Sequence, residues 1–284
     1  MRLTEYTHID DFLAAAEPVL LAREAENNLP LGIANRIRHE PHLIHIAPFL
    51  ATVADAEGVI LVALRTPPYN LILHAERQND AAIARLVSHM HAHGHVLGGV
   101  TGVVATAKAF AEAWSAHTTT AHRLHQSMRV FELRQVIPPP QPVGKARLAT
   151  EQDIPLLAQW RYDFAIEANV DQLTLEQAHE RTALQVAKAA DYVWQAAADA
   201  PPTCLVATSR RTAHGIVIGP VYTPPDQRGC GYASALTAFV SQAMLDSGYQ
   251  FCALFTDLAN PTSNSIYQKI GYRPLNDFSD YRFG

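Results

Sequence analysis

One stretch of the 284-residue chain, GIVIGPVYTPPDQRGCGYASA at residues 215–235, constrains the fold more than any other. Residues 215–223 are apolar and rich in β-branched side chains, a pattern typical of a buried strand. Pro224 and Pro225 end this strand, because proline has no N–H group to give to a neighbouring strand. A glycine-rich turn then opens a helix that we expect to end near Leu245.

The turn itself has the composition of an anion seat. Gly229 and Gly231 have no Cβ atom, so the backbone can adopt positive φ and approach a ligand closely. The first N–H groups of the helix have no internal partner and carry the positive end of its dipole, and Arg228 adds a full charge. The turn therefore predicts a phosphate or diphosphate site. It fits neither the P-loop pattern nor the G-x-G-x-x-G pattern of dinucleotide-binding folds.

A second segment follows one helix and one strand later. Residues 251–255 (FCALF) predict a short apolar strand, and residues 256–272 read TDLANPTSNSIYQKIGY. Here the chain resembles the GNAT superfamily of acyl-CoA-dependent N-acyltransferases. Residues 228–233 match its [QR]-x-x-G-x-[GA] loop, and the Asn-Pro-x-Ser-Asn-x-x-Tyr run matches its second cofactor segment. The resemblance covers roughly residues 143–284 and implies an α/β (α+β) fold, with a mixed, mostly antiparallel twisted sheet flanked by helices.

The resemblance also implies acetyl-CoA (coenzyme A) as the cofactor and assigns residues to it. In this family the fourth strand splays from the fifth, and its free edge pairs with the pantetheine arm. The diphosphate lies on the N–H groups of the turn, where we expect Ser234 to act as a cap. The implied cofactor-binding residues are Val221, Tyr222, Thr223, Gln227, Arg228, Gly229, Cys230, Gly231, Tyr232, Ala233, Ser234, Asn260, Asn264 and Tyr267.

Three residues are candidates for the chemistry. Tyr267 stands where the family often keeps a tyrosine that protonates the coenzyme A thiolate, and the alternative is a core aromatic residue of the last helix. Many relatives keep a glutamate on the fourth strand, but residues 215–223 contain no carboxylate. Glu167, late in a predicted helix, and His214, just before the strand, are the alternative bases. A chain of waters, or an amine that is already neutral, remains open as a further alternative.

The proline run at residues 138–142 predicts a stiff linker between two units. We expect an N-terminal unit at 1–137, the linker at 138–144 and an N-acetyltransferase unit at 145–284. The N-terminal unit weakly repeats the GNAT order of elements. However, its residues 75–80 (AERQND) contain no glycine and two acidic side chains, so they cannot cradle a diphosphate. It is therefore expected to be a degenerate, non-catalytic GNAT-like domain.

Composition narrows the remaining function classes. A net charge of −5 argues against nucleic-acid binding. The sequence contains no run of about 18 apolar residues, so we expect no membrane span. Three scattered cysteines fit a reduced cytoplasm. The four histidines of residues 89–95 suggest a metal, but side chains two apart on a helix face away from each other, so we expect no metal site. Residues 276–283 alternate and predict a last strand, whose acids would border the acceptor pocket or lie solvated on a sheet edge.

These observations predict an acyltransferase. It would move an acetyl group from acetyl-CoA to a primary amine of a small molecule or peptide, by direct attack in a ternary complex. The alternative is a non-enzymatic acyl-CoA-binding or regulatory protein, which the missing strand carboxylate favours. We expect a monomer or a homodimer, because the alanine-rich N-terminal stretches could pack within the chain or between chains.

Overall fold

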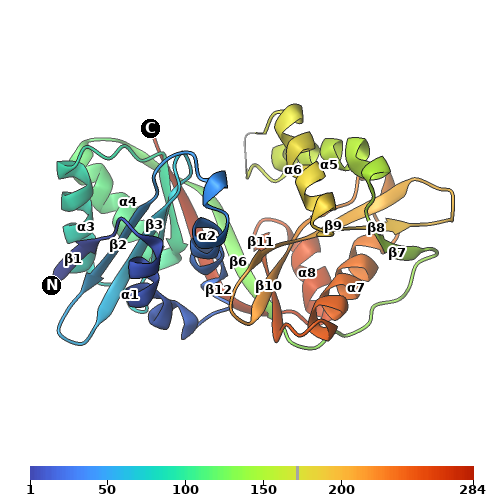
Figure 1. Ribbon diagram of the computed structural model, residues 1–284, viewed down its shortest axis with the longest axis horizontal. Coiled ribbons are helices and arrows are strands. Elements are labelled where there is room, and N and C mark those ends of the chain that lie inside the picture. Colours follow the sequence, from blue (N-terminus) through green and yellow to red (C-terminus); the bar gives the residue numbers. More distant parts are fainter. Residues whose placement is uncertain (171–172) are drawn as a thin grey trace.

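The computed structural model of the protein describes residues 1–170 and 173–284. Its described residues form a single mixed sheet of 12 strands, mostly antiparallel, with helices on both faces (Figure 1). The expected fold class is therefore confirmed. The elements of the N-terminal half are β1 (Arg2–Glu5), α1 (Ile9–Leu21), α2 (Asn28–His39), β2 (Phe49–Ala54), β3 (Val59–Arg65), β4 (Leu71–His74), α3 (Asp80–Ala92), β5 (Gly99–Val103), α4 (Val104–Thr118) and β6 (His122–Leu133).

The C-terminal half has the same order of elements. They are β7 (Lys145–Leu148), α5 (Ile154–Glu167), α6 (Leu175–Ala187), β8 (Asp191–Gln195), β9 (Pro202–Arg211), β10 (Gly215–Tyr222), α7 (Tyr232–Asp246), β11 (Phe251–Asp257), α8 (Pro261–Ile270) and β12 (Arg273–Phe283). Short 3-10 helices, η1 (Pro41–Leu43), η2 (Glu151–Asp153) and η3 (Pro225–Gln227), complete the described elements. Both halves thus follow the order β-α-α-β-β-β-α-β-α-β, and the sequence prediction had missed β1.

Each half has an apolar layer on both faces of its sheet. In the N-terminal half, α1 and α2 pack on one face through residues such as Phe12 and Leu20, and α3 and α4 pack on the other through Leu86 and Phe110. Alternation along the strands explains this arrangement, because successive side chains point to opposite faces. The C-terminal half repeats it, with α5 on one face and α7 and α8 on the other.

The two halves exchange their last strands. The sheet order is β1-β2-β3-β4-β5-β12-β6-β11-β10-β9-β8-β7, so β12 of the C-terminal half pairs with β5, and β6 of the N-terminal half pairs with β11. β6 and β12 also pair with each other along most of their length. Figure 1 shows the red end of the chain lying among the green and blue elements of the N-terminal half. Neither half completes its sheet without the other.

This position corrects the interpretation of β12 as a solvated edge strand. β12 lies inside the sheet, and its acidic residues have partners. Asp277 accepts two hydrogen bonds from Arg129 of β6, at 2.6 and 2.9 Å. Asp280 is buried and accepts hydrogen bonds of 2.7 Å from Asn70 and from Thr101. The acids of β12 therefore serve to join the two halves.

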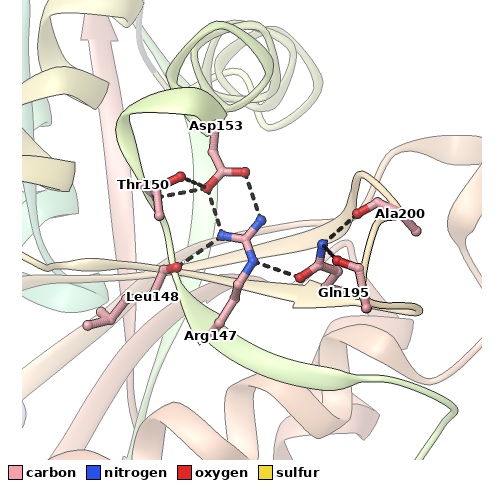
Figure 2. A network of polar contacts seen from close by, with 7 residues as sticks. Arg147, Leu148, Thr150, Asp153, Gln195 and Ala200 are labelled. Carbon is pink, nitrogen blue, oxygen red and sulfur yellow. Dashed lines mark hydrogen bonds and ion pairs between the residues drawn. The ribbon is translucent and has the colours of Figure 1, made fainter.

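Helix α5, which ends at Glu167, is fixed firmly at its start. Thr150 and Asp153 form a capping box there, a pattern that the sequence T-x-x-D already predicts, and Arg147 of β7 donates to both oxygens of Asp153 at 2.7 and 2.9 Å (Figure 2). Although burial raises the pKa of Asp153, the hydrogen bonds from Arg147 and Thr150 outweigh it and lower that pKa. A buried ion pair between Arg161 and Asp191 holds the middle of the helix on β8.

None of the helices in residues 1–170 and 173–284 combines the length and the apolar character that crossing a membrane requires.

Candidate functional site

The site begins where β10 and β11 separate. These parallel strands pair only through Gly215–Val217 and Phe251–Ala253, at the start of each strand. Beyond Val217, β10 continues on its other side along β9, with Val221 opposite Val206 and Tyr222 opposite Leu205. Within the described chain, the side of residues 218–222 that faces β11 has no strand partner. This free edge is the splayed fourth strand that the resemblance implied.

The glycine turn lies directly after this edge. Gly229 and Gly231 have φ of 81° and 82°, and a Cβ atom added to either would meet no atom within 4 Å. Gly231 is the N-cap of α7, and no side chain in the described part of the chain caps that helix. Ser234 does not cap it, because it is already the third residue of the helix. The N–H groups at this helix start are therefore left for a ligand or for water.

A charged cluster links the turn to α5. The Nη2 atom of Arg228 donates to Oε2 of Glu167 at 2.6 Å, and its Nε atom donates to the carbonyl oxygen of Thr223 at 2.9 Å. The Tyr222 hydroxyl donates to Oε1 of Glu167 at 3.0 Å. Burial and this contact with Glu167 raise the pKa of Tyr222 to about 12. The structure thus brings Glu167, Tyr222, Thr223 and Arg228 together.

Tyr267 lies on the far side of the same region and is only 8% exposed. Its ring packs against Phe131 and Tyr272, so it does belong to the core of this half. Burial, and then the nearby Cys204 thiol, raise its pKa well above the usual range. Cys204 in turn accepts a hydrogen bond of 3.2 Å from the Thr223 hydroxyl. Tyr267 is therefore both a core residue and a protonated phenol close to the end of β10.

The start of α8 carries two further candidate residues. Asn260 is the N-cap of α8 and accepts from the Ser263 N–H at 3.0 Å. Asn264 donates to the carbonyl oxygens of Asp257 and Asn260, at 3.0 and 2.8 Å, while its own Oδ1 atom is buried without a partner. An acceptor of this kind is costly to leave unpaired, so it marks a place for a donor on a ligand or for water.

Two residues of the N-terminal half that the sequence interpretation missed contact the ends of α5 and β11. Gln126 of β6 donates to the Asp257 carboxylate at 3.0 Å and to the Ala168 carbonyl oxygen at 3.3 Å. His125 forms a hydrogen bond of 3.1 Å with the carbonyl oxygen of Asn169. Gln126 therefore ties the end of α5 to the end of β11. No local pattern in the sequence points to it, because its partners lie 42 and 131 residues away.

His214 is not brought to this cluster. It precedes the first residue of β10, whereas Thr223 follows the last, so the full length of the strand separates them. Its Nδ1 atom lies 2.8 Å from Oε2 of Glu24, and its backbone N–H donates to Oε1 of Glu24 at 2.7 Å. The residue fastens the turn after α1 to the C-terminal half.

The remaining candidate residues line the turn. Gln227 ends η3, and Cys230 is exposed beside Gly229, while Tyr232 and Ala233 begin α7. An acyl-CoA fits these features: a free strand edge for an amide-containing arm, an uncapped helix start beside a cation for a diphosphate, and an orphaned carboxamide oxygen at Asn264.

The histidines of residues 89–95 have other partners. His89 lies 2.7 Å from a carboxylate oxygen of Glu5, and His93 bonds to the His89 carbonyl oxygen at 2.8 Å. Among the described residues, no group of three His, Cys, Asp or Glu side chains could hold a metal ion.

The sequence was compared with protein families and with curated proteins. Residues 202–282, from β9 through most of β12, match the family of FR47-like proteins. No curated protein matches the chain.

Solved structures match along nearly the whole length. A Drosophila protein shares 11% identity at a TM-score of 0.69, covering 99% of this chain and 98% of the other. A GCN5-related N-acetyltransferase from Sphaerobacter thermophilus shares 17% identity at 0.64, with 99% and 95% covered. A tandem GNAT protein from the clavulanic acid biosynthesis pathway shares 11% identity at 0.58, with 100% and 98% covered. At such identities the likeness shows the fold alone. The chain therefore carries an FR47-like segment at residues 202–282, and as a whole it has the fold of the GNAT acetyltransferases, tandem GNAT proteins among them.

Proposed function

We propose that the protein transfers an acetyl group from acetyl-CoA to a primary amine of a small molecule or peptide. One observation carries the proposal: a helix start with two open glycines, which no described side chain caps, stands beside a strand edge that has no partner among the described residues. Within the proposal, residues 145–284 hold the cofactor, residues 1–137 form a GNAT-like partner without a cofactor site, and 138–144 link them. The fold and the family match of residues 202–282 support acyl-CoA as the donor.

In this proposal the N–H groups of the turn and Arg228 hold the diphosphate, and the free edge at Val221–Thr223 pairs with the pantetheine arm. Acetyl-CoA supplies an activated acetyl group, whose carbonyl carbon bonds to the amine nitrogen as its bond to sulfur breaks. Holding both reactants in one place is the main contribution that such a site makes to the rate.

The chain's own residues move the protons. Glu167 takes the proton that the amine nitrogen loses, since its carboxylate stands at the splayed strand end. Tyr267 donates its phenolic proton toward the leaving sulfur, and its raised pKa means that the phenol is protonated at neutral pH. His214 has no part in this scheme, because it lies at the other end of β10.

The test has two stages. Calorimetry of the full chain with acetyl-CoA should show binding, and Arg228→Glu should weaken it severely by placing a carboxylate where a diphosphate would lie. A set of primary amines, for example ethanolamine, putrescine and lysine amide, should then give free thiol at a rate above that without amine. Failure of acetyl-CoA to bind would overturn the proposal.

A second candidate function is an acyl-CoA-binding protein without turnover. The absence of any carboxylate on β10 favours it, since Glu167 would then serve only to pair Arg228. Binding of acetyl-CoA without thiol release from any amine would establish this alternative.

A further inference from the structure

Arg228 already has partners before any ligand arrives. Its side chain contacts the Glu167 carboxylate at 2.6 Å and the Thr223 carbonyl oxygen at 2.9 Å, and its guanidinium carbon lies 5.9 Å from the centre of the Tyr222 ring. The Arg228 and Glu167 side chains are 48% and 44% exposed, so a ligand can reach both. The ion pair therefore links the glycine turn to Glu167, the last residue of α5.

This ion pair conflicts with both roles in the proposed function. While Glu167 holds Arg228, the positive charge next to the turn is neutralised. At the same time Oε2 of Glu167 accepts an N–H group of Arg228, which leaves one lone pair of that oxygen instead of two for an amine. Both residues are better placed for these roles once they part.

We infer that the coenzyme A diphosphate and Glu167 compete for Arg228, so that cofactor binding is the event that frees the Glu167 carboxylate. The inference rests on the proposed function. An exposed ion pair contributes little in water, whereas a diphosphate offers Arg228 more negative charge together with the helix N–H groups. The exchange is therefore favourable once the cofactor is present.

Tyr222 keeps the freed carboxylate in place. Its hydroxyl donates to Oε1 of Glu167 at 3.0 Å, on the oxygen that Arg228 does not use. Because its pKa is raised to about 12, the phenol remains a donor at neutral pH. Departure of Arg228 thus exposes Oε2 alone, on a carboxylate whose other oxygen is still held. The acceptor amine finds its base only after the cofactor has bound, which sets the order of binding.

Competition for Arg228 should lower the affinity of the wild type for coenzyme A. Removing the charge of Glu167 removes a competitor, so Glu167→Gln should bind coenzyme A more tightly than the wild type even as transfer is lost. From the usual strength of an exposed ion pair, the dissociation constant should fall by about twofold to fivefold.

Asp163 supplies the matched control. It lies one turn earlier on α5, carries the same charge, and bonds to Gln159 at 2.8 Å rather than to Arg228. Asp163→Asn changes the net charge by the same amount and should leave the dissociation constant nearly unchanged. Glu167→Gln should also have no effect in an Arg228→Gln background, because the competition is then already absent.

The experiment is calorimetry of coenzyme A with the full-length wild type and these variants at low ionic strength, with thermal unfolding to confirm that each variant is folded. Tighter binding by Glu167→Gln alone, abolished in the double variant, supports the inference. Unchanged or weaker binding by Glu167→Gln, or equal tightening by Asp163→Asn, overturns it while leaving the proposed function standing. A wild type that binds no coenzyme A overturns both.

Discussion

The connection from the fourth strand to the third helix differs between the two halves of this protein. After β4, residues 75–80 lead into α3, whose first turn is capped by Asn79 through a hydrogen bond of 3.0 Å from the Ala82 N–H. After β10, a glycine turn leads into α7, which no described side chain caps. β4 pairs with β5 through Leu71–Leu73, three of its four residues, whereas β10 leaves β11 after Val217.

The difference lies in which backbone groups the described residues satisfy. At the N-terminal junction the Asn79 side chain accepts from one of the first N–H groups of the helix, which stabilises the helix start. At the C-terminal junction a strand edge and a helix start have no such partner among the described residues, and Arg228 lies beside them. The element order is the same in both halves, so the contrast depends on a few residues rather than on the architecture.

The strongest test of the comparison is to separate the halves. A chain that begins at Gly144 lacks β6, so β11 loses a neighbour and β12 loses both of its neighbours. We expect this chain not to fold, as judged by circular dichroism and by loss of cooperative thermal unfolding. As a control, a protease site placed in the linker at 138–144 should allow cleavage without separating the halves. An isolated C-terminal half that unfolds cooperatively would contradict the expectation.

The next test concerns the glycine turn. Gly231→Ala forces a side chain into φ of 82°, which costs about 1–2 kcal/mol and disturbs the helix start, so coenzyme A affinity should fall at least about tenfold by calorimetry. Gly94, after α3, has φ of 71° and equally open surroundings. Gly94→Ala should cost similar stability without changing coenzyme A binding. Equal losses of affinity in both variants would show that the turn has no special role.

A smaller effect is expected at Gln126, the N-terminal residue that reaches the C-terminal site. Gln126→Leu keeps the size but removes both hydrogen bonds, so the end of α5 should loosen and Glu167 should lose its fixed position. We expect acetyl transfer to fall about tenfold with little change in coenzyme A affinity. Faster hydrogen exchange at Ala168 and Asn169 should accompany the loss. Gln242→Leu, on the exposed side of α7, should change neither measurement.

The smallest effect is expected at the N-terminal cap. Asn79→Ala removes the side chain that holds the start of α3 and should lower the free energy of unfolding by about 1 kcal/mol. Thermal unfolding measures this, and coenzyme A binding should be unaffected. New coenzyme A affinity in this variant would mean that the capped junction is a masked site rather than a degenerate one.

Much of this architecture can be predicted from the sequence, because it depends on local patterns. Apolar strands, proline breaks, the capping box at Thr150 and the glycine turn were all recognisable over a few residues. β1 was missed because its four residues carry no buried pattern. The position of β12 could not be predicted, because alternating acids look like a solvated edge until Arg129, Asn70 and Thr101 are known to meet them.

The site was predicted to a similar depth. The turn and the start of α8 belong to contiguous motifs, so both could be recognised from the sequence, and their role as cofactor-binding segments stays a prediction. The Arg228–Glu167 pair joins residues 61 apart, and Gln126 reaches partners in another half, so neither contact leaves a trace in local sequence. His214 was a candidate base because it adjoins β10 in the sequence. However, it precedes the first residue of β10, and the extended strand separates it from the cluster at the other end.

The central place of β12 has a consequence for how the protein is made. β12 follows every other strand of the sheet in the sequence. During synthesis on the ribosome, β5 and β6 therefore keep open edges until β12 emerges and pairs with both of them. Exposed edges of this kind recruit strands from other molecules. Folding during synthesis should therefore depend on chaperones in the interval before β12 emerges, and damage to β12 should produce aggregates rather than a folded protein.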